Sequence, residues 1–270
     1  MGVGTLITGP LKSEINSSAL AHEIGEDMSL PLEWDTSLGK TKKQPALVVD
    51  PVHGVLPYDG FRNPLTRSNT AHRISMAIAT PATKGQRKIY HFDGAREMAV
   101  ALEALLSPEL YGLEVQLPPV FYRGVNGKLR SHSFDLRITF RDGYRRAVYV
   151  RHGRSLARPE TQDEIEAIFA ATPKSFADDK IVVNGDQYTK RYRDNLLRIW
   201  NSLNTPYPDI DAQVLECARN TNFWLMSDLI AKCHLSSAQT FQAIFRLIGQ
   251  GYLKANWNAV ICRHSRIWIG

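Results

Sequence analysis

Hydrophobic residues recur with helix or strand periodicity in a series of segments between residues 88 and 203. After Asp93, a residue type that often caps helices, apolar residues return every three to four positions, which predicts a helix with one buried face. The residues on this face are Met98, Leu102, Leu105 and Leu106. Strands are predicted at residues 88–92, 113–122, 130–140, 144–151 and 180–183, and further helices at 160–171 and 188–203. This order predicts an α/β fold in which helices flank a mixed sheet.

Turn residues separate the middle strands of this region. Asn126-Gly127 and Asp142-Gly143 each stand between two predicted strands, and both pairs suit hairpin turns that need positive φ. Pro118-Pro119 lies within the segment 113–122 and predicts a bent or edge strand there. The three middle strands should therefore form an antiparallel meander.

Residues 206–270 follow a different pattern. Two prolines indicate a linker, a short helix ends at Cys233, and Ser236 caps a second helix. The buried stripe of the second helix consists of Phe241, Ile244, Phe245 and Ile248, and its outward residues are Gln239, Gln242, Arg246 and Gln250. Gly251 ends this helix, and two short strands around residues 256–258 would form a wing. The succession predicts a helix-turn-helix followed by a β-hairpin, the winged-helix plan.

Residues 1–86 lack a sustained period. They mix Gly, Pro, Ser, Lys and Thr, apart from a short apolar run at residues 46–49 that has the composition of a strand. We interpret this part as an N-terminal extension or arm. The sequence thus predicts three parts, namely the extension at 1–86, an α/β domain at 87–205 and a winged-helix domain at 206–270.

Charge is concentrated in two stretches of the chain, whose net charge is +6. Residues 120–158 contain two acids and ten basic residues, which are Arg123, Lys128, Arg130, Arg137, Arg141, Arg145, Arg146, Arg151, Arg154 and Arg158. The stretch from Phe223 to the end contains five basic residues and one acid. Such an excess favours contact with polyphosphate, and the alternative is a solvated basic face.

The sequence also bounds the compartment and the cofactors. No apolar run reaches the roughly 20 residues needed to span a bilayer, and the N-terminus lacks the pattern of a secretory signal. The three cysteines, Cys217, Cys233 and Cys262, are too widely spaced for a zinc motif or a disulfide framework, so we interpret them as core residues. We expect a cytoplasmic protein.

The strongest candidate for chemistry is Asp135, which lies in a predicted strand between Phe134 and Leu136 and should point away from both. The next strand ends in Arg151. An acid on one strand, beside apolar residues that end in a cation on the next, is the layout of a metal-dependent endonuclease core. The alternative to a metal-binding role for Asp135 is a salt bridge with Arg151. The alternative for Glu97 is that of an ordinary helix residue that faces solvent.

Several motifs follow one another in a particular order. They are Arg96-Glu97, Val115-Gln116-Leu117-Pro118, Ser133-Phe134-Asp135-Leu136, Tyr149-Val150-Arg151 and Leu247-Ile248-Gly249-Gln250-Gly251-Tyr252-Leu253-Lys254-Ala255-Asn256-Trp257. In this order they resemble the TnsA family, the endonuclease subunit of Tn7-like transposition machinery. That family joins a PD-(D/E)XK nuclease core to a C-terminal winged helix, and the resemblance covers residues 88–270.

The resemblance implies roles for single residues. Glu97 and Asp135 would be catalytic metal ligands, the backbone carbonyl of Val150 would be a third ligand, and Gln116 would support the site. Mg²⁺ or Mn²⁺ would be the cofactor, because hydrolysis of a phosphodiester suits a hard cation held by carboxylates and water.

Two residues depart from the family pattern. Arg151 stands in place of a lysine; it would contact the scissile phosphate, but a guanidinium cannot act as a base. Tyr149 stands in place of an acid or amide, and a phenol with a pKa of about 10 is a poor metal ligand at neutral pH. We therefore expect impaired cleavage.

The resemblance implies double-stranded DNA as a partner, together with a transposase and an ATPase regulator. The residues expected to bind DNA are Arg130, Arg137, Arg145, Arg146, Arg154, Gln239, Gln242 and Arg246. A second hypothesis is a non-catalytic DNA-binding regulator or assembly subunit that uses the same core as a scaffold. A third is that the winged helix contacts protein, because its outward residues are rich in glutamine.

Overall fold

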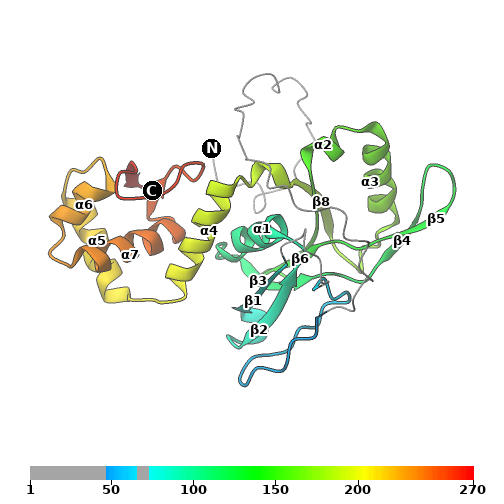
Figure 1. Ribbon diagram of the computed structural model, residues 1–270, viewed down its shortest axis with the longest axis horizontal. Helices are drawn as coiled ribbons and strands as arrows, with labels where there is room; N and C mark the ends of the chain where they lie inside the picture. Colours follow the sequence, from blue (N-terminus) through cyan, green and yellow to red (C-terminus); the bar gives the residue numbers. More distant parts are fainter. Residues whose placement is uncertain (1–46, 66–72) are drawn as a thin grey trace, which may run out of the picture.

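The computed structural model describes residues 47–65 and 73–270 of the chain. It is a mixed α/β protein, as the sequence predicts, with an α/β region joined through a long helix to a mostly helical C-terminal region (Figure 1). The elements of the α/β region are β1 Ile74–Ala79, η1 Pro81–Thr83, β2 Arg87–Phe92, α1 Ala95–Leu105, β3 Leu110–Val115, β4 Val120–Arg123, β5 Leu129–His132, β6 Leu136–Phe140, β7 Arg145–Arg151, α2 Gly153–Leu156, α3 Pro159–Ala171, β8 Asp179–Asn184, η2 Gly185–Gln187 and α4 Lys190–Leu203.

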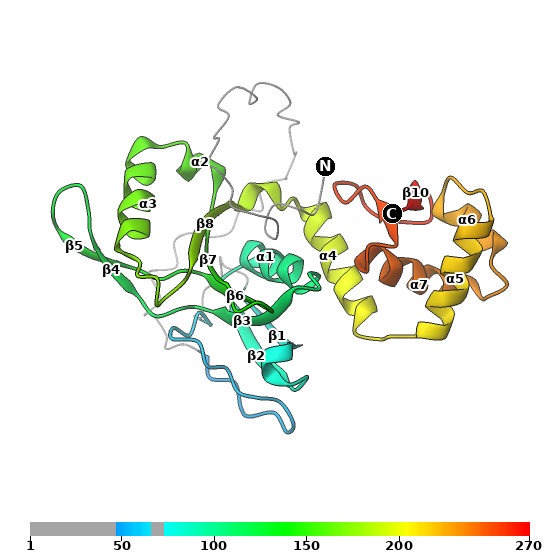
Figure 2. The ribbon, with the colours of Figure 1, turned by 180° about the vertical axis from the view of Figure 1, so that it is seen from behind.

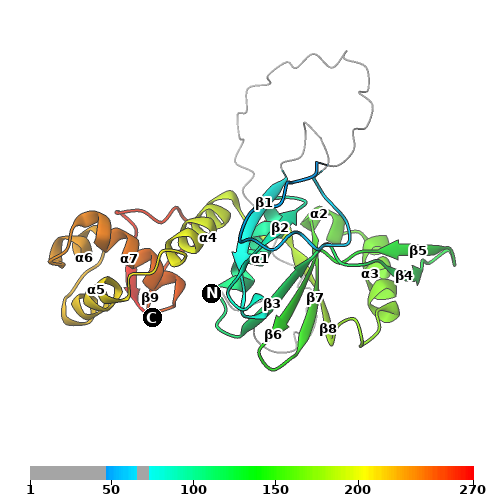
Figure 3. The same cartoon turned by 90° about the horizontal axis from the view of Figure 1, so that it is seen from below.

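A four-stranded sheet with the order β3-β6-β7-β8 forms the centre of the α/β region (Figure 3). The pairs β3–β6 and β6–β7 are antiparallel, whereas β7 and β8 are parallel, so the sheet is mixed. Leu136 and Val148 belong to a core cluster shared with α1 and α4, whereas Ala147 and Tyr149 pack with Ile168 of α3. Helices therefore cover both faces, since successive residues of a strand point to opposite faces.

Two strands that the sequence predicted as continuous are broken in the structure. β3 ends at Val115 and the chain resumes as β4 after Pro118-Pro119, which cannot donate to a ladder. The segment 130–140 likewise divides into β5 and β6, and Asp135 lies in the gap. β4 and β5 pair only with each other, as a separate hairpin. The two predicted turns are confirmed, with φ of 72° at Gly127 and 87° at Gly143.

The N-terminal part contains a strand, β1, that the sequence pattern did not predict. β1 pairs with β2 along its whole length, and Leu56 bridges to Lys88. The predicted boundary at residue 86 therefore falls between two paired strands. Residues 47–49 form no strand, which corrects the interpretation of the apolar run at residues 46–49. Residue 46 lies outside the described residues, as do the other residues of 1–46 and 66–72.

The C-terminal region consists of α5 Pro208–Asn220, α6 Met226–Lys232, α7 Ser237–Gly249, β9 Leu253–Ala255 and β10 Ile267–Ile269. The helix α5 was not predicted, because Pro208 was interpreted as part of a linker. Pro208 instead occupies the first turn of α5, where its missing N–H costs nothing. Ser236 caps α7 as predicted, and β9 and β10 form an antiparallel hairpin whose second strand lies later than the sequence indicated.

The helix α4 belongs to both regions. Leu196 and Trp200 pack in the core of the α/β region, and Ile199 packs in the core of the C-terminal region. The buried Asn195 holds the β9–β10 connection, since its Nδ2 donates to the carbonyl oxygens of Trp257 and Ala259 at 3.0 and 2.7 Å. In the described ranges 47–65 and 73–270, no helix has the length and apolar content required to cross a membrane.

Candidate active site

The carboxyl groups of Glu97 and Asp135 meet in a partly buried site beside the central sheet. Glu97 lies in the first turn of α1, and Asp135 lies directly before β6. The two carboxyl groups lie close enough for each to shift the pKa of the other. The structure thus brings together two acids that are far apart in the sequence and that the motif resemblance assigned to one site.

Asp135 is held by the backbone of β7. Its Oδ2 accepts from the Val150 N–H at 2.7 Å, and its own N–H donates to the Val148 carbonyl at 3.1 Å. Phe134 packs on the α3 side of the sheet and Leu136 on the α1 side, so the expectation that Asp135 points away from both is wrong. Regular alternation stops at this residue, and the break lets its carboxylate lie along β7 toward Glu97.

Glu97 accepts hydrogen bonds from a residue that precedes α1 and from a residue that follows β3. Its Oε2 accepts from the Asp93 N–H at 2.8 Å and from Gln116 Nε2 at 3.2 Å. The cap of α1 is Gly94, which corrects the prediction that Asp93 caps this helix. The Asp93 carboxylate instead pairs with Arg62 and Arg73, each at 2.9 Å.

Gln116 connects the two acids. It is fully buried, its N–H donates to the Asp135 carbonyl at 3.0 Å, and its side chain donates to Glu97. Its φ of 51° lies in the left-handed region, which is uncommon for a residue with a side chain. Strain of this kind persists only where surrounding contacts enforce it, and it is concentrated at functional sites.

Arg62 is a site residue that sequence reasoning missed. Its Nε and Nη2 donate to Gln116 Oε1 at 2.9 and 2.7 Å, and Nη2 also donates to Asp93. Its charge lowers the pKa of Asp135, although burial has the larger, opposite effect. The surrounding segment has turn composition and no periodicity, so only its fold against the sheet reveals this position.

Burial dominates the electrostatics of the acidic pair. It raises the pKa of Glu97 well above its usual range, and the charge of Asp135 raises it further. Burial also raises the pKa of Asp135, against the opposing effects of the Val150 N–H, Glu97, Arg151 and Arg62. Two carboxyl groups this close cannot both ionise without a large cost, so at neutral pH the pair shares a proton.

These properties fit a divalent cation. A cation in place of the shared proton removes the repulsion between Glu97 and Asp135. Mg²⁺ binds through one or two carboxylates and retains several waters. The two carboxylates with the backbone carbonyl of Val150 would therefore be an adequate donor set. In the part of the chain that the structure describes, no group of three or more His, Cys, Asp and Glu side chains is arranged to hold a metal.

Arg151 and Tyr149 lie on the side of the site nearest α3. The Arg151 guanidinium carbon lies 4.7 Å from the centre of the Tyr149 ring. No ion pair joins Arg151 to Asp135 among the described residues, which argues against the salt bridge considered from the sequence. Burial raises the pKa of Tyr149 to about 12, so the phenol keeps its proton at neutral pH.

His132 packs behind these two residues. Its ring centroid lies 4.0 Å from that of Tyr149 and 5.0 Å from that of Phe134. Burial, with the nearby charge of Arg151, lowers the pKa of His132 to about 4. The imidazole is therefore neutral at physiological pH and part of an aromatic cluster.

Several arginines that the sequence assigned to DNA binding instead stabilise the fold. Arg146 is buried and pairs with Asp179 at 2.9 Å. Arg246 is buried and pairs with Asp211 of α5 at 2.7 Å. Arg137 pairs with Glu114 at 2.7 Å, and Arg145 donates to Asp178 and two carbonyls. Arg146 and Arg246 are therefore corrections to the predicted DNA surface, because neither is accessible.

The remaining predicted contacts are exposed. Arg154 lies on the surface at α2, and Arg130 lies on β5 with a loose ion pair to Glu164 at 3.5 Å. In α7, Gln239 completes the capping box with Ser236, and Gln242 accepts a hydrogen bond from Ser202 of α4. The exposed part of α7 is therefore its first turns, since its second half is buried.

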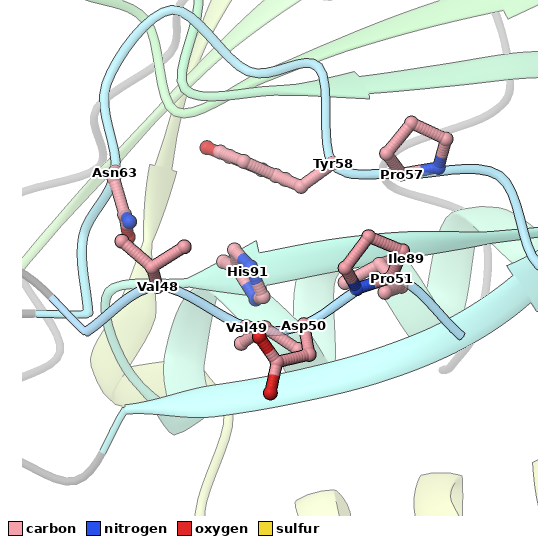
Figure 4. A pocket seen from close by; sticks show the side chains of 9 residues that line it. All are labelled: Val48, Val49, Asp50, Pro51, Pro57, Tyr58, Asn63, Ile89 and His91. Carbon is pink, nitrogen blue, oxygen red and sulfur yellow. The ribbon is translucent and has the colours of Figure 1, made fainter.

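A cavity of about 190 Å³ lies outside the acidic pair, which contributes no residue to its lining. Its lining residues are Val48, Val49, Asp50, Pro51, Pro57, Tyr58, Asn63, Ile89 and His91, as Figure 4 shows. The Tyr58 and His91 rings pack there with centroids 4.4 Å apart, and His91 Nδ1 hydrogen-bonds Ser75 Oγ at 2.8 Å. The lining is mostly apolar, and we assign no chemistry to it.

Comparison with known proteins supplies no assignment. No model of a protein family matches the chain, and a search of curated proteins finds no match. The resemblance to the TnsA family thus depends on the sequence motifs and on the chemistry of the residues that the fold brings together.

Proposed function

We propose that this chain is a TnsA-like DNA-processing protein of a Tn7-like transposition system or another mobile element. Its α/β region would be a PD-(D/E)XK nuclease-like domain, and its C-terminal region a winged-helix domain. The observation that carries the proposal is the meeting of Glu97 and Asp135 beside Val150. Buried acids in contact, with raised pKa values, are typical of functional sites and of metal sites before the ion binds.

The residues of the site suit a weak endonuclease. Glu97, Asp135 and the Val150 peptide would hold Mg²⁺ or Mn²⁺, which when bound supplies Lewis-acid activation of the phosphate and a water of lowered pKa. Arg151 would orient the scissile phosphate through its fixed charge. Neither Arg151 nor the protonated Tyr149 can take a proton from the attacking water, so cleavage should be slow.

The expected partners follow from the same proposal. Double-stranded DNA would be the substrate, and a transposase and an ATPase regulator would be protein partners. The exposed Arg130 and Arg154 and the first turns of α7 are the accessible members of the surface predicted from the sequence. Phosphate contacts by such residues make binding salt-dependent.

Plasmid nicking tests the proposal. Supercoiled DNA should be nicked slowly in Mg²⁺ or Mn²⁺ and not in EDTA, and Asp135→Ala should reduce the rate roughly 100-fold or more, because the variant loses a metal ligand. Glu216→Ala is a matched control, since Glu216 is an exposed acid of α5. Nicking that survives Asp135→Ala would place the activity elsewhere and refute the assignment.

A second function, a non-catalytic DNA-binding regulator or assembly subunit, is favoured by one observation. The Arg151 guanidinium stacks on Tyr149 in the place of the lysine that the resemblance calls for. If the protein binds DNA without nicking it, Arg151→Lys is the informative variant. Gain of nicking by at least about tenfold would show a decayed active site, whereas binding with no nicking in either protein would favour the scaffold.

A further inference from the structure

The β4–β5 hairpin projects from the α/β region at the end remote from the C-terminal helices (Figure 1 and Figure 2). Its strands pair Phe121 with Ser131 and Arg123 with Leu129, and it shares no ladder with the central sheet. A two-stranded ribbon alone is marginally stable in water, so one of its faces must pack on another element.

The two faces of the hairpin differ. The inner face packs on α3, where Val120 and Tyr122 are buried and the Tyr122 hydroxyl donates to Glu164 at 2.5 Å. On the outer face, Phe121 is 63% exposed and Leu129 is 67% exposed, and Val125 in the turn is 81% exposed. Large apolar side chains with this exposure on one projecting element indicate a contact surface.

The charge of the hairpin indicates the kind of partner. Residues 120–134 contain Arg123, Lys128 and Arg130 and no acidic residue. The exposed Arg123 guanidinium donates to the Gly127 carbonyl at 3.1 Å. A surface with several cations and no acids is complementary to a polyanion, and a two-stranded ribbon fits the major groove of duplex DNA. Apolar side chains at such a surface can contact thymine methyl groups or base steps.

The base of the hairpin reaches the candidate active site. His132 ends β5, and its ring contacts Tyr149, over which Arg151 lies. Asp135 follows three residues after His132, next to Glu97. A duplex with one phosphate at the acidic pair would therefore extend past the hairpin on one side.

We propose that the outer face of this hairpin, formed by Phe121, Arg123, Val125, Lys128 and Leu129, binds duplex DNA beside the phosphate that is cut. This inference rests on the proposed function and deepens it, because it assigns a DNA contact outside the acidic pair. Arg123 and Lys128 contact phosphates, and the apolar residues contact the groove.

A charge-removal experiment tests the electrostatic part. The full chain with Arg123→Gln and Lys128→Gln should bind a fluorescent duplex at least about tenfold more weakly at 0.1 M salt, and the slope of log affinity against log salt should fall by about two. The matched control is Lys84→Gln with Arg87→Gln, which removes two exposed cations from the turn end of the β1–β2 hairpin. Equal losses in both double variants would reveal a general charge effect and overturn the inference.

An apolar variant tests the groove contact separately. Phe121→Ser with Leu129→Ser should weaken binding severalfold without changing the salt slope, because no phosphate contact is removed. Both residues lie on the outer face, so the melting temperature should stay near that of the unmodified protein. Binding equal to that of the unmodified protein would overturn this contact.

Two further outcomes separate this inference from its rivals. If the hairpin variants change self-association in sedimentation velocity while DNA binding is unchanged, the outer face docks protein and the inference is wrong. If the unmodified protein neither binds nor nicks DNA, the proposed function fails as well. If it nicks DNA through Asp135 and the hairpin variants bind normally, only the hairpin assignment fails.

Discussion

Two pairs of ionisable residues, one buried and one partly buried, differ in the signs of their charges. In the C-terminal region, Asp211 and Arg246 carry opposite charges, and the guanidinium donates to both carboxylate oxygens at 2.7 to 2.9 Å. In the α/β region, Glu97 and Asp135 carry the same charge and share a hydrogen bond only when one is protonated. The first pair is complete by itself, whereas the second requires a proton or a cation from outside.

A charge with a complete set of protein partners serves the fold, whereas like charges held together serve another property. Arg246 also stacks over Tyr207 at 5.4 Å, so each part of its side chain has a protein partner. Like charges buried together lower stability, and a fold retains them where another property is served. Arg246 therefore joins α5 to α7, and the acidic pair remains available to bind a cation.

The largest expected effect breaks the complete pair. Arg246→Leu leaves the Asp211 carboxylate buried and unpaired, which should lower the free energy of unfolding by roughly 3–5 kcal/mol in urea denaturation. The double variant Asp211→Leu with Arg246→Leu removes both charges and should lose much less. If Arg246→Leu is as stable as the unmodified protein, water can replace the guanidinium as the partner of Asp211, and the pair does not stabilise the fold.

A smaller effect is expected at the support of the acidic pair. Arg62→Ala removes the donors that orient Gln116, and Gln116 in turn holds Glu97. The affinity for Mn²⁺, measured by calorimetry, should fall about 10- to 100-fold, as for other residues that orient metal ligands. Arg87→Ala, an exposed arginine of β2, is the control. Unchanged affinity would show that Arg62 does not support the proposed metal site.

The smallest effect concerns pH. Because the folded-state pKa of Glu97 is raised, the folded state binds this proton more tightly than the unfolded state. The stabilisation is complete below the unfolded pKa and is lost as pH rises through the folded pKa. Between about pH 5 and pH 8.5 in EDTA, the unmodified protein should lose at least about 1 kcal/mol relative to Glu97→Gln. Parallel pH profiles from thermal unfolding would contradict the raised pKa.

Sequence patterns predicted the secondary structure where hydrophobic periodicity was long and local. The helix with Met98 and Leu102 and the turns at Gly127 and Gly143 depend on neighbouring residues, and all are present. The break after Val115 could not be predicted from neighbouring residues. Contacts with Asp135 and Arg62, which are distant in sequence, enforce the left-handed conformation of Gln116.

The error at Arg246 has a related cause. A single apolar stripe predicted that α7 buries one face, with Arg246 outside. In the fold α7 packs against α4, α5 and α6, and the unpredicted α5 supplies Asp211. Arg246 was therefore interpreted as a DNA contact, because its partner Asp211 lies in α5. That helix was not predicted, since its first residue, Pro208, indicated a linker.

The residue Asn195 has a mechanical consequence. It ties the connection between β9 and β10 to α4, the helix whose Leu196 and Ile199 enter different cores. Bending at this junction would expose residues of one of the two cores, so the α/β region and the C-terminal region should move as one rigid body. The orientation of α6 and α7 relative to Glu97 and Asp135 should therefore be constant in solution.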